Sequence, residues 1–172
     1  MALDAAAVEQ FTQGRLNHED AETQRQLDAA LAAARRYCGW HVTPVVTETV
    51  TLDGTGGRLL ALPTLRLVSI ESLNENGETV DPETLEWSTR GLVLKAGAWT
   101  DRLSGITATI EHGFDEAADF DSAVLSSIER GGFSSDAVPT VIGPFQYADT
   151  PASGLFSAAE VSILDRYALE KL

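Results

Sequence analysis

The chain has 172 residues, which suits one ordinary domain, and its 26 acidic residues against 12 basic ones give a formal net charge of −14. Such a charge favours solubility but repels phosphate, so we expect no tight grip on nucleic acid. The single cysteine excludes an internal disulfide, and no segment is apolar over the length that a bilayer requires, so we expect synthesis in the cytoplasm and no membrane partner.

Two helices are predicted at the N-terminal end. Residues 3–12 are rich in alanine and carry apolar side chains at helical spacing. A longer second helix is predicted within residues 17–40, with Asn17 as its N-cap and Gly39 as its C-terminal cap. Its core face follows four residues at spacings of four, three and four: Leu27, Leu31, Ala34 and Cys38. This position makes Cys38 a buried hydrophobic residue rather than a nucleophile.

The middle of the chain is predicted to form antiparallel hairpins. The β-branched run of residues 45–53 leads into a glycine-rich turn at residues 53–57 and should pair with residues 58–62. Residues 67–73 should pair with residues 78–80 through Asn76-Gly77, which tolerates the positive φ angles of a type I′ turn. Two further segments, residues 85–87 and 92–94, flank another short turn. Residues 106–112 alternate between apolar and polar side chains, as a half-buried strand does.

A third helix is predicted over residues 119–130, and the chain then changes character. Residues 131–154 contain three prolines and four glycines without a helical apolar period, so we interpret them as an extended arm. Ser157 and Glu160 have the spacing of a capping box, with Phe156 and Val161 at the positions of a hydrophobic staple. The terminal helix that begins there should reach the end of the chain, and a helix this short must dock on something to be stable.

No catalytic, metal or cofactor site is predicted. The three histidines, His18, His41 and His112, are far apart in sequence and lack the spacing of metal ligands. The densest carboxylate cluster consists of four residues: Asp115, Glu116, Asp119 and Asp121. It could hold a divalent cation, or serve a small hydrolase through Asp115 and Asp119, but acidic residues at the start of a helix already have an electrostatic reason to be there.

Seven short segments in a fixed order stand out along the chain. They are Arg35-Arg36-Tyr37-Cys38-Gly39-Trp40-His41-Val42 with Pro44, Leu62-Pro63, Leu67-Val68-Ser69-Ile70, Asn76-Gly77-Glu78, Ile110-Glu111-His112-Gly113-Phe114, Gly143-Pro144-Phe145-Gln146-Tyr147 and Ile163-Leu164-Asp165-Arg166-Tyr167. With these motifs the chain resembles the head-to-tail adaptor (head-tail connector) proteins of long-tailed phages, and its last segments are similar to those of phages of actinobacteria. The resemblance covers nearly the whole chain.

The resemblance implies a non-enzymatic virion protein located in the neck. It would form a ring, usually of twelve copies, beneath the portal protein and extend the channel through which viral DNA passes without specific binding. Its other face would meet the next neck or tail protein, a stopper or a tail terminator. The alternative is an unrelated bacterial α+β interaction domain in a multiprotein complex.

The expected fold class is α+β, with an N-terminal helix pair and a third helix packed with a small antiparallel sheet of hairpins. Residues 1–132 would form the globular core, and residues 133–172 an extended arm that ends in a docking helix. The predicted hairpin tips at residues 53–57 and 75–78 are alternative candidates to face the DNA channel, with Glu75 and Glu78 as the carboxylates of the second, because polar hairpin tips carry carboxylates toward whatever passes. The residues expected to dock on the portal are Phe145, Tyr147, Phe156, Val161, Leu164, Tyr167 and Ala168.

Overall fold

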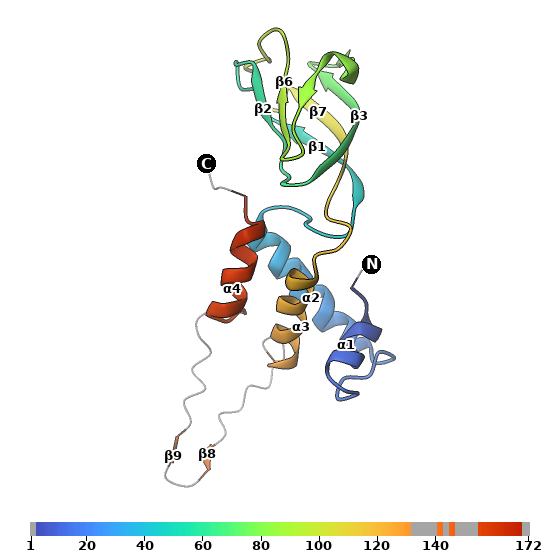
Figure 1. Cartoon of the computed structure of the whole chain (residues 1–172), viewed down its shortest axis with the longest axis vertical. Coiled ribbons are helices and arrows are strands. Elements are labelled where there is room, and N and C mark those ends of the chain that lie inside the picture. Colours follow the sequence, from blue (N-terminus) through green and yellow to red (C-terminus); the bar gives the residue numbers. More distant parts are fainter. Residues whose placement is uncertain (1–2, 132–140, 143–144, 147–154, 170–172) are drawn as a thin grey trace. The chain divides into compact units, whose positions relative to one another are not determined.

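The computed structural model describes residues 3–131, 141–142, 145–146 and 155–169, and the chain divides into two compact units (Figure 1). The strand unit comprises residues 39–116 with Leu169, and the helical unit comprises residues 2–38 and 117–168. The fold class is α+β, as expected from the sequence. The division differs from the expected core and arm, because the terminal helix belongs with the other helices.

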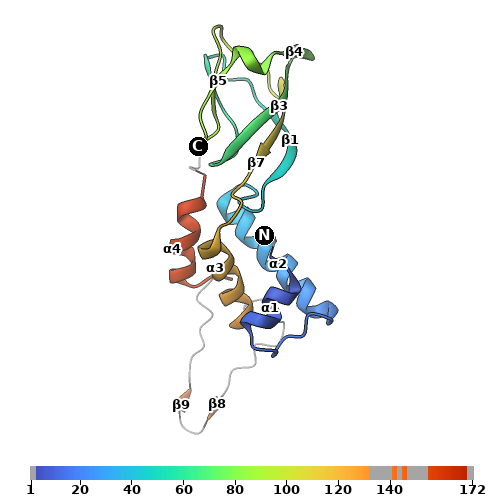
Figure 2. The same ribbon diagram turned by 45° about the vertical axis from the view of Figure 1, so that its right-hand side comes forward.

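The helical unit contains α1 (Ala5–Phe11), α2 (Ala21–Cys38), α3 (Ala118–Glu129) and α4 (Ala158–Leu164), which continues into a 3-10 turn, η2 (Asp165–Tyr167). Helix α3 packs against α1, α2 and α4, and Figures 1 and 2 both show α3 and α4 side by side. A two-stranded antiparallel pair, β8 (Val141–Ile142) and β9 (Phe145–Gln146), lies between α3 and α4 in the sequence. The buried apolar side chains of the helical unit include Val8, Leu27, Ala30, Ala34, Cys38, Phe120, Ala123, Val124, Ile128 and Leu164.

Helix α2 begins later than the sequence predicted. Asn17 accepts a bond from the backbone N–H of Glu19 at 2.8 Å, which forms a turn before the helix. Asp20 then caps α2 by accepting from the backbone N–H of Glu22 at 2.9 Å. The prediction of Asn17 as the N-cap was therefore wrong, because two capping-type residues stand three positions apart and the second one starts the helix. The other end is confirmed, since Gly39 has a φ of 82° directly after Cys38.

The strand unit is built from two antiparallel sheets, and Figure 2 labels the two strands, β4 and β5, that Figure 1 leaves unmarked. The larger sheet has the order β1-β7-β3-β4 and the smaller one β2-β6-β5. A short 3-10 turn, η1 (Pro82–Thr84), precedes β5. The strands are β1 (Val46–Leu52), β2 (Leu59–Ala61), β3 (Leu67–Glu75), β4 (Glu78–Val80), β5 (Glu86–Trp87), β6 (Leu92–Leu94) and β7 (Ile106–His112).

Both sheets contribute side chains to one hydrophobic cluster. Strand β7 shows the expected alternation, with Ile106, Ala108 and Ile110 fully buried. Leu60 and Val93 from the smaller sheet and the buried ring of Trp99 join the same cluster. Burial of each large apolar side chain contributes roughly 1.5 to 3 kcal/mol, so this shared cluster is the main force that holds the strand unit together.

Two of the predicted hairpins are confirmed and one is wrong. Strands β3 and β4 pair through Asn76 (φ 55°) and Gly77 (φ 85°), and β5 pairs with β6. Strand β1, however, pairs along its whole length with β7, and β2 pairs with β6. Gly54, just after β1, allows a close approach of two backbone segments: a Cβ on Gly54 would lie 2.0 Å from the carbonyl oxygen of Thr100.

Candidate docking surfaces

Glu75, at the end of β3, is held inside the strand unit. Its Oε2 pairs with Nζ of Lys95, and its Oε1 accepts from the backbone N–H of Thr100 at 2.5 Å. Only 16% of the side chain is exposed. Burial alone would raise the pKa of Glu75, but the bonds from Lys95 and Thr100 outweigh it, so the pKa is lowered from its ordinary value. Glu75 therefore fastens the segment of residues 95–100 to the sheet instead of presenting a free carboxylate.

The same segment is fixed by a second set of contacts. Nζ of Lys95 lies 4.5 Å from the ring centroid of Trp99, a cation–π distance. The indole N–H of Trp99 donates to the carbonyl oxygen of Arg58 at 3.1 Å, and the side chain is 2% exposed. These contacts make the loop between β6 and β7 a well-supported part of the strand unit.

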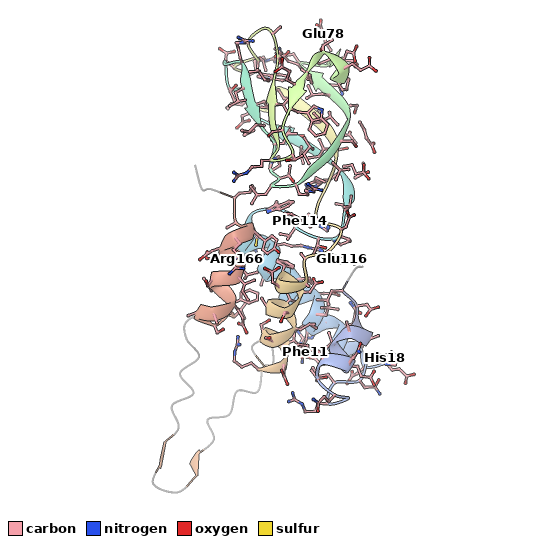
Figure 3. The ribbon with its side chains drawn as sticks, in the orientation of Figure 1. Phe11, His18, Glu78, Phe114, Glu116 and Arg166 are labelled. Carbon is pink, nitrogen blue, oxygen red and sulfur yellow. The ribbon has the colours of Figure 1, made fainter. Side chains whose placement is uncertain are left out.

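Glu78, the other carboxylate expected to face a DNA channel, has an exposed side chain. It lies directly opposite Glu75 in the β3–β4 pairing and is labelled at the hairpin end of the strands in Figure 3. The structure thus separates two neighbouring carboxylates that look alike in the sequence. For this hairpin tip, the channel-facing expectation rests on Glu78 alone and stays a prediction.

Helix α4 has the predicted capping box. Oγ of Ser157 accepts from the backbone N–H of Glu160 at 3.4 Å, and Oε2 of Glu160 accepts from the backbone N–H of Ser157 at 2.6 Å. Glu160 also receives two bonds from the guanidinium of Arg130, at 2.5 and 2.8 Å, which join the start of α4 to the end of α3. The sequence predicts Glu160 as a capping residue and places Arg130 at the end of the third helix. It does not predict that the two side chains pair, because 30 positions separate them.

The apolar side of the terminal helix is covered by its own chain. Leu164 has no exposed surface, and α4 packs against α3 and α2. We had expected this helix to pack on a neighbouring subunit, and for Leu164 that expectation is corrected. A seven-residue helix is marginal alone, and the nearest apolar surface is the helical unit from which it extends.

The remaining portal-docking candidates fall into two groups, one partly buried and one outside the described residues. Phe156, Val161, Tyr167 and Ala168 are partly buried, and the backbone of Ala168 is extended, so it lies beyond the helical stripe. Tyr167 packs edge-on against Phe120 at 5.7 Å and donates its hydroxyl to Asp119. Tyr147 and the side chain of Phe145 lie outside the described residues.

The described residues contain no group of three or more histidine, cysteine or carboxylate side chains that could hold a metal ion. Asp119 of the predicted carboxylate cluster accepts from Tyr167 and lies 3.7 Å from Arg166. Burial raises the pKa of the Cys38 thiol to about 12, which removes the thiolate that a nucleophile needs.

Two of the three histidines, His41 and His112, lie close together in the strand unit. Nε2 of His112 lies 3.1 Å from a carboxylate oxygen of Glu48, and the rings of His41 and His112 are 6.3 Å apart. The histidine ring at the end of β7 thus has an evident packing role. Within the described part of the chain, no helix has the length and apolar character needed to cross a bilayer.

No protein-family model matches the chain, and no curated protein matches it. Among solved structures, it is similar to a chain in the neck of a native gene transfer agent (GTA) particle with C12 symmetry, at 15% identity and a TM-score of 0.64. A chain in the neck of an empty GTA particle with C6 symmetry gives 16% identity and a TM-score of 0.65. A chain in the virion of the native particle is similar at 16% identity and a TM-score of 0.64.

Each of these matches covers 100% of this chain and 94% of the other chain. At this level of identity the likeness shows a shared fold.

Proposed function

We propose that the protein is a structural head-to-tail adaptor of a tailed phage or phage-like particle, located in the virion neck. In this role it forms a ring beneath the portal protein, extends the DNA channel and joins the capsid to the next neck or tail protein. It carries out no chemical reaction. The observation that carries the proposal is the shared fold over the full chain with proteins from GTA particle necks.

A ring is supported by the symmetry with which those neck structures were computed, C12 for the native particle and C6 for the empty one. We propose twelve copies for this protein as well. Closed rings use heterologous contacts, in which one surface of a subunit meets a different surface of the next. The net charge of −14 opposes such contacts in free solution, so we expect a monomer or weak oligomer that closes into a ring on the portal.

The charge also suits a channel for DNA. Each basic residue that meets a phosphate adds a favourable contact, and several such contacts would hold the DNA in place. A lining with exposed carboxylates such as Glu78 avoids this, so DNA passes without being bound.

Attachment to the portal is assigned to the arm, with Phe145 and Tyr147 as its anchors. Both residues belong to types that contribute about 1.5 to 3 kcal/mol when buried at an interface. Because α4 is already docked on its own unit, we propose that it serves as the fixed base of the arm. Phe156 and Val161, which are only partly buried, stand where the arm meets that base.

The test is to mix the full chain with its portal protein and follow assembly by sedimentation velocity and negative-stain microscopy. The proposal predicts slow sedimentation of the free protein and closed rings in the mixture. The double variant Phe145→Ala/Tyr147→Ala should weaken portal binding at least about a hundredfold. The matched control is Phe11→Ala, at an exposed position on α1, which should bind normally.

The outcomes separate the parts of the proposal. Free protein that stays a monomer in the presence of portal rings would overturn the adaptor function. Rings that form equally well with the double variant would leave the adaptor role standing and remove the arm as the portal contact.

A further inference from the structure

A pocket of about 460 Å³ lies in the strand unit, where the tip of the β3–β4 hairpin meets the loop before β7. It is open to solvent and is lined mainly by polar side chains. The side chains that line it are those of Asn74, Asn76, Arg102, Leu103, Ser104 and Thr107. None of the residues that were given a role in the proposed adaptor function lines this pocket.

Backbone bonds fix the walls of the pocket. The N–H of Asn76 donates to the carbonyl oxygen of Gly105 at 2.7 Å, which ties the hairpin tip to the loop. The carbonyl oxygen of Arg102 accepts from Gly54 at 2.9 Å. The N–H of Ser104, a residue with a φ of 53°, donates to Oδ1 of Asp53 at 2.6 Å. The loop is thus held in one shape before any ligand arrives, which lowers the entropy cost of binding.

The pocket presents hydrogen-bond donors. Oδ1 of Asn74 accepts from the hydroxyl of Thr79 at 3.1 Å, and Oδ1 of Asn76 accepts from the hydroxyl of Thr100 at 3.4 Å. Their amide groups therefore have N–H donors left for a ligand. The guanidinium of Arg102 is exposed and forms no ion pair with any carboxylate of the described residues. Two amide donors beside a guanidinium, with no carboxylate in the lining, are a set that matches an anion.

The surroundings favour a carboxylate of a protein over a phosphate of nucleic acid. Asp101 is adjacent to Arg102 and exposed, Asp53 lies beneath the loop, and Glu78 is exposed on the same hairpin, so a strand with many phosphates would be repelled more strongly than a segment with a single carboxylate. The rim residue Leu103 is 81% exposed, the highest fraction among the large apolar side chains described as exposed. An apolar side chain at the rim gains from contact with an apolar residue of a protein partner.

We propose that this pocket is a docking site for a segment of a partner protein that carries a single carboxylate beside an apolar residue. An aspartate or glutamate of that segment bonds to Arg102, Asn74 and Asn76, and an apolar neighbour of that residue covers Leu103. Glu75 is a positioning residue for the site, because its bond to Thr100 fixes the loop that carries Arg102. Recognition thus combines a charge-assisted bond to Arg102 with one apolar contact at Leu103.

The experiment uses the full chain labelled with ¹⁵N and follows side-chain amide signals of Asn74 and Asn76 by NMR. The probe is the capped tripeptide acetyl-Leu-Asp-Leu-amide, and its counterpart has asparagine in place of aspartate. Saturable shifts are expected with the aspartate peptide and a dissociation constant at least about tenfold weaker with the asparagine peptide. Inorganic phosphate and a single-stranded oligothymidylate are titrated in parallel.

Three variants sharpen the result. Arg102→Gln should weaken binding of the aspartate peptide about tenfold or more, and Leu103→Ser should weaken it several-fold. Arg90→Gln removes an exposed arginine from the β5–β6 turn of the same unit and should leave binding unchanged. All three positions are exposed, and unchanged backbone signals elsewhere will show that each variant is folded.

The proposal is overturned by any of three results: no shift at Asn74 and Asn76, equal affinity for the two peptides, or full binding by Arg102→Gln. Stronger shifts with oligothymidylate or phosphate than with the aspartate peptide would also overturn it, in favour of a phosphate site. None of these outcomes depends on ring formation, so the pocket and the adaptor function fail separately.

Discussion

The bond between Glu160 and Arg130 offers a quantitative test of how the terminal helix is held. The Glu160 side chain is 7% exposed and receives two bonds from Arg130, whose side chain is 45% exposed. Removing one member of a fully buried pair costs about 3 to 5 kcal/mol, whereas an exposed pair contributes about 0 to 1 kcal/mol. With one partner buried and the other half exposed, we expect a coupling free energy of about 1 to 2 kcal/mol.

The assay is a double-mutant cycle made of Glu160→Ala, Arg130→Ala and the double variant, with unfolding free energies from urea titration. The cycle separates the energy of the Glu160–Arg130 pair from that of the capping box, to which Glu160 contributes and Arg130 does not. The matched control is the cycle of Asp119 with Arg166, whose side chains are 42% and 69% exposed and lie 3.7 Å apart, and its coupling should stay below about 0.5 kcal/mol.

The sign of the pH dependence follows from the pKa of Glu160. Burial raises that pKa, but the bonds from Arg130 and Ser157 together outweigh burial, and the folded-state pKa lies below the ordinary value of 4.5. The stabilisation is therefore complete above about pH 4.5 and is lost as the pH falls through the folded-state pKa. A coupling that is no larger than in the control cycle, or that grows on acidification, would refute this account of the helix.

Three further substitutions or reagents test the packing. Leu164→Ala should lower the free energy of unfolding by about 2 to 5 kcal/mol, measured by urea titration, because the side chain is fully buried in the helical unit. Cys38 is buried and its thiol pKa is raised, so a thiol reagent should modify it no faster than the protein unfolds. The measurement compares the rate of modification at pH 8 with that of a free thiol. Gly91→Ala should lower the melting temperature more than Gly77→Ala does. Both glycines have positive φ, but only at Gly91 would a Cβ meet backbone, at 2.8 Å from the carbonyl oxygen of Thr64.

Features set by neighbours in the sequence could be predicted well. The capping box at Ser157, the Asn76-Gly77 turn and the alternation in β7 each depend on a few adjacent residues, and all three are confirmed. The position of Cys38 on the core face of α2 is confirmed for the same reason, since helical spacing alone defines that face.

Features set by distant residues could not be predicted. The glycines after β1 were interpreted as a hairpin turn, but the partner of β1 is β7, some 60 positions away. Likewise nothing near Glu75 distinguishes it from Glu78, and only the fold brings Lys95 and Thr100 to its carboxylate. The pocket around Arg102 also arises from a hairpin tip and a loop that are separate in the sequence.

The most direct test of the central claim is a cryo-electron microscopy reconstruction of the full chain bound to its portal protein. The account predicts a closed ring of twelve copies on the portal, with the DNA channel continuing through it and Glu78 near the lumen. A complex in which single copies bind at isolated sites, or a ring whose centre is closed by the folded units, would contradict it.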